Sequence, residues 1–286
     1  MKKSENSNRE KRGAIPCNVI EMKKTSHIIQ KVQINIPFTM LYDTYLDAFI
    51  TNGLNPEIGL DAAALDRFTY EDFSSIAGEF RKNSRTVTLH GPFIDLNPGS
   101  TDSAVRRVTE QRFEQLIELV PLFEPKSVVC HAGYDAKRYD YFKDTWLEKC
   151  LELWSRLAGR LAENGSRLML ENVYEDGPED IQIIFERLKD AGVGFCLDSG
   201  HVSAFSQSDL EFWLEILGPY LGQLHLHDNF GNSDAHLALG RGTIDFSKIF
   251  NYLKKTADKR PIITIEPHRE NELWSSLEYL ARAWPW

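Results

Sequence analysis

The sequence predicts an α/β protein folded as a (β/α)₈ barrel, also called a TIM barrel. From Val32 onward, short apolar runs alternate strictly with longer amphipathic stretches, and the alternation repeats eight times. Near-continuous apolar strands separated by helices are typical of a parallel sheet covered by helices. Eight such units fit the length of a closed barrel. The alternative is an open doubly wound sheet, which the eight-fold count and the positions of candidate ligands disfavour.

The strand candidates are short and rich in apolar residues, and they span residues 32–37, 56–61, 86–91, 127–133, 167–172, 193–200, 222–228 and 261–267. The helix candidates between and after them span residues 41–52, 71–82, 102–120, 140–164, 179–191, 208–218, 246–256 and 271–282. Asp102, Asp209 and Asp245 are placed to cap helices, and Pro178 suits a first helical turn. Residues 1–25 are charged and lack periodicity, which predicts a disordered tail. Residues 26–286 then form one catalytic domain.

Composition limits the partners that we expect. Of the 286 residues, 42% are hydrophobic and 26% are charged, and the net charge is −9. A surface of this sign repels phosphates, so DNA is an unexpected partner. The sequence shows no signal peptide and no membrane span, and its four cysteines form no C-x-x-C pair, so we expect a cytoplasmic, reducing location. The oligomeric state stays open.

Candidate metal ligands stand at the ends of six consecutive predicted strands, the third to the eighth, or in the loops after them. The chemistry of such barrels lies at the C-terminal ends of the strands. Nine residues of this kind are present: His90, His131, Glu171, Asp198, His201, His225, Asp234, His236 and Glu266. Taken singly, a histidine at a strand end is more often a core residue than a ligand. Four carboxylates at one mouth, however, require neutralisation, and two to three divalent ions would supply it.

The ligand types narrow the choice of ion and suggest contacts to substrate. Because the set holds nitrogen and oxygen donors without sulfur, zinc or manganese is expected, with iron or cobalt as alternatives. Asn172, Tyr134, His227 and Arg241 are the residues that we expect to contact substrate. Arg241 would clamp a phosphate or carboxylate, although a plain surface charge is an equal interpretation.

These residues resemble the motifs of the xylose-isomerase-like barrels, which include type IV apurinic endonucleases and sugar-phosphate isomerases and epimerases. The motif H-x-G corresponds to residues 131–133, E-N to 171–172, D-x-x-H to 198–201, H-L-x-D to 225–228 and D-x-H-x-x-L-G to 234–240. His90 and Glu266 complete the endonuclease pattern, which has nine ligands. The resemblance covers residues 32–282.

The resemblance implies a trinuclear centre. Glu171 would bridge two ions, the first held with His90 and His131 and the second with Asp198, His225 and Glu266. The third ion would then belong to His201, Asp234 and His236. Glu171 and Glu266 are predicted as catalytic residues in a metal-dependent hydrolase, a phosphodiesterase in which water attacks phosphorus.

The branch of the family bears on the substrate. Stretches such as INIPFTMLYDTYL and HLALGRG resemble the cobamide-remodelling phosphodiesterases, which implies a corrinoid with its nucleotide loop as the small-molecule substrate. The acidic loop after the second strand, with Asp61, Asp66, Glu71 and Asp72, departs from the DNA-repair enzymes. A sugar (phosphate) isomerase or epimerase is the alternative, since it needs one metal held by Glu171, Asp198, His225 and Glu266. An apurinic endonuclease is the further alternative.

Overall fold

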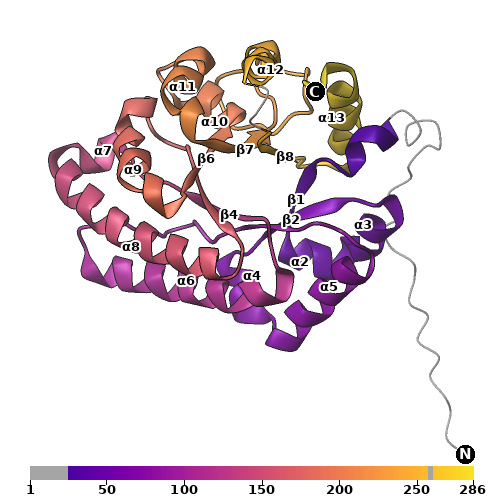
Figure 1. The fold of residues 1–286 in the computed structure, drawn as a ribbon, viewed down its shortest axis with the longest axis horizontal. Helices are drawn as coiled ribbons and strands as arrows, with labels where there is room; N and C mark the ends of the chain where they lie inside the picture. Colours follow the sequence, from indigo (N-terminus) through magenta and orange to yellow (C-terminus); the bar gives the residue numbers. More distant parts are fainter. Residues whose placement is uncertain (1–24, 257–259) are drawn as a thin grey trace, which may run out of the picture.

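Eight parallel strands close into a barrel in which each strand pairs with its sequence neighbours and β1 meets β8. Figure 1 shows the helices arranged around these strands. The structure is a computed structural model, and it describes residues 25–256 and 260–286. The predicted (β/α)₈ barrel is therefore confirmed. The predicted tail, residues 1–25, lies outside the described residues except for Thr25, which is buried.

The strands lie close to their predicted positions. They are β1 (Gln33–Pro37), β2 (Asn55–Gly59), β3 (Thr88–His90), β4 (Ser127–His131), β5 (Arg167–Glu171), β6 (Gly194–Asp198), β7 (Leu221–Leu226) and β8 (Ile262–Ile265). The predicted sixth strand, residues 193–200, is too long. It ends at Asp198, because the Asp198 side chain accepts the backbone N–H of His201 and so begins a helix.

The helices follow the predicted alternation, with extra short segments. The α-helices are α2 (Phe38–Met40), α3 (Leu46–Asn52), α4 (Ala62–Arg67), α5 (Tyr70–Lys82), α6 (Ser103–Phe123), α7 (Ala136–Tyr139), α8 (Lys143–Glu163), α9 (Gln182–Arg187), α10 (Ser199–Phe205), α11 (Leu210–Leu217), α12 (Phe246–Lys255) and α13 (Glu270–Ala283). A π-helical turn, η1 (Leu41–Tyr45), joins α2 to α3, and 3₁₀ turns occupy η2 (Asp140–Phe142), η3 (Pro178–Asp180), η4 (Lys189–Ala191) and η5 (Gly218–Tyr220).

Local chemistry explains where several helices begin. Asp102, Asp209 and Asp245 each accept a backbone N–H from the first turn of α6, α11 and α12, which confirms the predicted caps. Thr69 and Asp72 form a reciprocal capping box at the start of α5. The longer helices bury apolar side chains, among them Trp146 and Trp154 of α8, which are fully buried, whereas the four-residue α7 buries none. Every helix in the described residues is too short or too polar to cross a lipid bilayer.

A polar network fills the inside of the barrel below the mouth. Glu57 of β2 is fully buried. Its Oε2 accepts hydrogen bonds from Thr88 Oγ1 at 2.9 Å, Gln223 Nε2 at 2.5 Å and Thr264 Oγ1 at 3.1 Å. Its Oε1 lies 2.9 Å from His225 Nε2, as a charge contact rather than an aligned hydrogen bond. The network therefore fixes the Glu57 carboxylate in place, and this carboxylate holds the His225 ring through its Nε2 atom.

This network predicts the effect of Glu57→Ala. Removing the carboxylate leaves the hydroxyls of Thr88 and Thr264 without this acceptor and takes one of two acceptors from Gln223 Nε2, so we expect the free energy of unfolding to fall by about 3 kcal/mol or more. Glu118→Ala, at an exposed position of α6, is the control and should change stability by less than about 0.5 kcal/mol. Urea denaturation followed by circular dichroism measures both, and equal stability of the two variants would contradict the role given to the network.

Candidate metal centre

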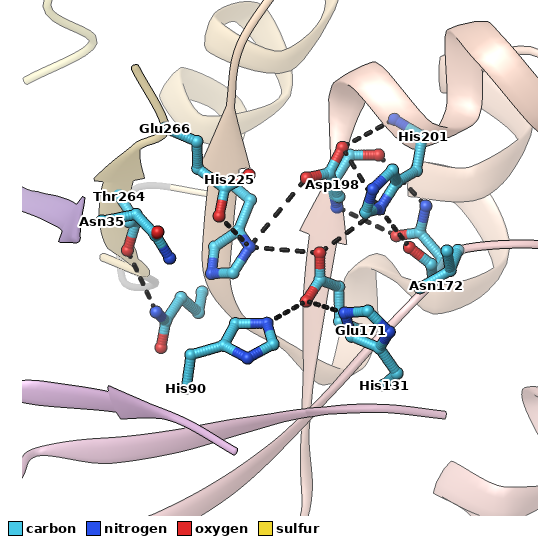
Figure 2. Close-up of polar contacts among 12 residues, drawn as sticks. Asn35, His90, His131, Glu171, Asn172, Asp198, His201, His225, Thr264 and Glu266 are labelled. Carbon is cyan, nitrogen blue, oxygen red and sulfur yellow. Dashed lines mark hydrogen bonds and ion pairs between the residues drawn. The ribbon is translucent and has the colours of Figure 1, made fainter. Parts of the chain in front are cut away.

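Glu171 lies at the centre of the barrel mouth and contacts four histidines (Figure 2). Its Oε2 is 3.1 Å from His90 Nε2 and 3.6 Å from His131 Nε2. Its Oε1 is 3.1 Å from His225 Nδ1 and 3.3 Å from His201 Nδ1. The side chain is 1% exposed, so both oxygens are committed to these ring nitrogens. This carboxylate thus connects the ends of β3, β4 and β7 with the helix after β6.

A second group of donors surrounds His225 Nδ1. Glu266 Oε1 lies 3.1 Å from this nitrogen and Asp198 Oδ2 lies 3.9 Å from it, beside the Glu171 contact. Both carboxylates are buried. Three carboxylates therefore face one imidazole nitrogen at the ends of β5, β6 and β8.

A third group lies in the loop after β7. Asp234 Oδ2 is 3.1 Å from His236 Nε2 and 3.4 Å from His201 Nε2. Asp234 Oδ1 is buried and has no hydrogen-bond partner. His236 adopts a left-handed backbone conformation, with φ of 46°, which is uncommon for a residue other than glycine and turns its ring back toward the mouth. All nine predicted ligands thus meet at one mouth, and their assignment to ions stays a prediction.

Charge pairing dominates the protonation of the mouth. Burial raises the pKa of Glu171, but the charges and hydrogen bonds of His225, His201 and His90 outweigh it and hold that pKa well below its usual value. Burial lowers the pKa of His236, yet the hydrogen bond to Asp234 and nearby acidic charges raise it to about 9. In the protein without cations, protonated histidines therefore offset the buried carboxylates. Divalent ions are the charges that would replace those protons.

His131 differs from the other histidines at the mouth. Burial is the main reason that its pKa falls to about 3, and the neighbouring histidines lower it further while Glu171 opposes the shift. The ring is therefore neutral near pH 7 and keeps a lone pair free for a metal. The Phe93 ring stacks on it at 4.2 Å between centroids, which fixes the orientation of the imidazole.

Asp228 shapes the Gly-rich loop that carries Arg241. It is fully buried. Its two oxygens accept backbone N–H groups from Asn229, Gly240, Gly242 and Ile244 at 2.8–3.1 Å. The course of this loop in space thus depends on a carboxylate that the sequence analysis left without a role. Arg241 itself is exposed on the loop, and its contact with substrate stays a prediction.

The other predicted substrate contacts lie deeper. Tyr134 is 1% exposed and its ring packs edge-on against Trp146 at 4.9 Å, within the core. Both side-chain amide atoms of Asn172 bond to the backbone of Asp198, at 2.9 and 3.1 Å, which ties β5 to β6. His227 is buried against Asp198. None of these three side chains reaches the surface of the mouth. Their positions are therefore explained by packing and by hydrogen bonds between segments, and contact with substrate stays a prediction.

Glu57 and Glu175 are buried carboxylates that the sequence analysis missed. The alternation of an acid with apolar neighbours inside NPEIG could have indicated that Glu57 faces the barrel interior. Glu175 lies in the loop after β5, where its Oε2 accepts the N–H of Val173 at 2.6 Å. Its Oε1 is buried without a partner, and burial raises its pKa to about 7. No strand-end position signalled it, because its role depends on how the loop folds back.

The chain belongs to the xylose isomerase-like TIM barrel family, whose model matches residues 56–283. Among the relatives, MJ1311 of Methanocaldococcus jannaschii is 28% identical over 59% of this chain and 60% of its own length. The probable endonuclease 4 of Mycobacterium leprae is 23% identical over 70% of this chain and 81% of that protein. The match thus spans less than two thirds of the archaeal relative.

Two solved structures share the fold over most of the chain. A protein from Thermus thermophilus, solved after soaking with ZnCl2, superposes with a TM-score of 0.74 at 27% identity, covering 88% of this chain and 97% of that one. A D-tagatose 3-epimerase-like protein gives a TM-score of 0.72 at 21% identity, with 89% and 97% covered. The family model and the shared fold therefore confirm the predicted resemblance to the xylose-isomerase-like barrels.

The raised pKa of Glu175 predicts a pH-dependent stability. The folded state holds the proton more tightly than the unfolded chain, so this contribution is complete below about pH 4.5 and is lost as the pH rises through about 7. Relative to Glu175→Gln, the metal-free wild type should lose about 2 kcal/mol of unfolding free energy between pH 5 and pH 8. Urea denaturation at both pH values measures the difference, and a constant difference would show that Glu175 ionises normally.

Proposed function

We propose that this protein is a metal-dependent phosphodiesterase that acts on a compact ligand, in which two to three divalent ions occupy the mouth of the barrel. The observation that carries the proposal is the convergence of three donor groups around Glu171. A one-metal isomerase needs Glu171, Asp198, His225 and Glu266. The additional donors on both sides of this set, His90, His131, Asp234 and His236, support a larger centre.

The donors fit such ions in type and spacing. Several groups of three, among them His90 with Glu171 and His225, and His227 with Asp234 and His236, place their ligand atoms within 4.8 Å of one another. Imidazole nitrogen and carboxylate oxygen suit zinc, manganese, iron and cobalt. The buried, unpartnered Asp234 Oδ1 is satisfied if a cation lies against it.

The roles of the chain's residues follow from these positions. Divalent ions in the mouth would lower the pKa of the attacking water and offset negative charge on the phosphoryl oxygens. Glu171 lies between two donor groups and would be shared by the ions that they hold. Glu266, at the end of β8 and 9% exposed at its side chain, is the carboxylate placed to orient water. The Asp228-anchored loop would bring Arg241 toward an anionic substrate.

Exposed aromatic residues at the mouth support a ligand with a large apolar surface. Phe93, Tyr174 and Phe230 are 41%, 58% and 59% exposed, and they lie in the loops after β3, β5 and β7. Phe93 stacks on His131, and Tyr174 packs against Phe205, whose ring lies 5.8 Å from that of His201. Phe93 therefore borders the donor groups directly, and Tyr174 borders them through Phe205. A corrinoid with its nucleotide loop combines an apolar ring system with one phosphodiester, and we propose it as the substrate.

A sugar isomerase or epimerase is the second candidate. The fold shared with the D-tagatose 3-epimerase-like protein and the cluster of Glu171, Asp198, His225 and Glu266 favour it. In that reaction Glu171 and Glu266 would be the proton-transfer pair. Such an enzyme has no use for a third donor group at Asp234 and His236. An apurinic endonuclease would use all three groups, but the net charge of −9 opposes binding to a duplex.

The first test of the proposal is the number of metals. Elemental analysis of protein reloaded with zinc or manganese should give between two and three ions per chain, because three donor groups are present. Glu171→Gln should lower the metal content by one to two ions per chain, because Glu171 is shared by two of the proposed ions, and should lower turnover by at least tenfold while the circular dichroism spectrum is kept. A wild-type chain that saturates at one ion would refute the multinuclear centre and favour the isomerase.

The second test concerns the substrate. After incubation with a cobamide, an abasic DNA duplex and a set of sugar phosphates, mass spectrometry should detect the nucleotide portion released from the cobamide. Tyr174→Ser should raise KM for the cobamide about tenfold through lost apolar contact. Val108→Ser, at a residue 50% exposed on α6, should leave KM unchanged. Incision of the duplex with the cobamide intact would instead identify a repair enzyme, and epimerised sugar would identify the isomerase.

A further inference from the structure

His227 is a buried histidine of the mouth that stands outside the nine predicted ligands. It directly follows β7, two residues after His225, and is 1% exposed. Its Nε2 lies 3.1 and 3.2 Å from the two oxygens of Asp198. The same nitrogen lies 3.6 Å from Asp234 Oδ1 and 3.8 Å from Glu266 Oε2. Three carboxylates from three different segments therefore face one imidazole nitrogen.

Two neighbours fix the position of the His227 ring. The His236 ring stacks on it at 3.8 Å between centroids, with the planes 6° apart. Gly200 of α10 also lies against the ring, and a Cβ atom there would stand 1.9 Å from Cε1 and 2.4 Å from Nδ1 and Nε2. Gly200 thus provides the space that the imidazole occupies. In the D-x-x-H segment of this chain, the third position is a glycine for a steric reason that involves His227.

Two buried atoms here have no hydrogen-bond partner, Asp234 Oδ1 and His227 Nδ1. Asp234 Oδ1 lies 3.6 Å from His227 Nε2, beyond hydrogen-bonding distance. Burying an acceptor in this state is costly. A cation between Asp234 Oδ1 and His227 Nε2 would bind a lone pair of each atom. The ligand atoms of His227, Asp234 and His236 lie within 4.8 Å of one another, and so do those of His227, Asp198 and His201.

We propose that His227 Nε2 is a fourth protein ligand of the third ion, beside His201, Asp234 and His236, and that Gly200 seats its ring. The inference rests on the metal centre proposed above and adds a ligand to it. Three histidines and one carboxylate fill the four positions that zinc takes in closed sites. The third ion should therefore exchange more slowly than the ions held by Glu171, and it should leave fewer positions for water or substrate.

The test measures metal retention rather than turnover. Zinc-loaded wild type, His227→Ala and His227→Asn are dialysed against increasing concentrations of a chelator, and the zinc remaining on each chain is measured by elemental analysis. Both variants should lose one zinc equivalent at a chelator strength at least tenfold below that required by the wild type, with the other equivalents unchanged. Asparagine can still hydrogen-bond to Asp198 but is a poor zinc ligand. Wild-type retention by His227→Asn would therefore overturn the inference.

Gly200→Ala provides an independent test that leaves every donor in place. The added methyl group should displace the His227 ring and reproduce the loss of one equivalent. In the double variant with His227→Ala, the methyl group should add no further loss, because the ring is already absent. Gly159→Ala in α8, where a Cβ meets no atom within 4 Å, is the matched control. Retention by Gly200→Ala equal to that of the control would overturn the seating role.

Metal counts distinguish failure of the multinuclear centre from failure of His227 as a ligand. If the wild type itself binds a single ion, the multinuclear centre is refuted, and His227 loses its proposed ion with it. If the wild type binds three ions and the His227 variants keep all three, the centre stands and the fourth ligand is refuted. Circular dichroism of each variant distinguishes loss of the ion from loss of the fold.

Discussion

The Glu171 carboxylate is the group on which the arrangement of the mouth depends. A carboxylate that is 1% exposed cannot stay ionised without neighbouring positive charge, and four histidines from β3, β4, β7 and α10 supply contacts to it. Each of these histidines stands on an element that the barrel fixes independently. The barrel therefore brings imidazoles that are far apart in the sequence to one buried carboxylate, and their contacts with Glu171 determine how these rings are oriented.

Beneath the mouth, the barrel interior is polar where an ordinary core would be apolar. Glu57 with Thr88, Gln223 and Thr264 forms a satisfied network, so its burial costs less than that of an isolated charge. His225 lies between this network and Glu171, with one ring nitrogen toward each carboxylate. The orientation of the His225 ring is thus determined by a carboxylate at each ring nitrogen, which suits a residue that is proposed to present one nitrogen to a metal.

The alternation of strands and helices could be predicted from the sequence, because the hydrophobic period and the length of a segment depend on neighbouring residues alone. The donors at the strand ends could be predicted as well, because a barrel brings all its strand ends to one mouth. Helix α10 could not be predicted, because its start depends on the Asp198 side chain accepting the N–H of His201. Glu57 and Asp228 were missed because their roles depend on partners up to 207 and 16 residues away, which no local pattern records. Glu175 was missed because its burial depends on how the loop after β5 folds back.

The main-chain anchoring of the loop around Arg241 has an evolutionary consequence. Asp228 accepts backbone N–H groups of residues 240, 242 and 244, so the path of the loop does not depend on the side chain of Arg241. Positions 240 and 242 do require glycine, because Gly240 has a φ of 79° and a Cβ at Gly242 would lie 2.1 Å from the Asn229 carbonyl oxygen. If Arg241 contacts the substrate as proposed, substitutions at this single position would change which ligand is accepted while the donors around Glu171 keep their places. A barrel of this kind could then acquire a new substrate without any change in its strands or in the side chains at their ends.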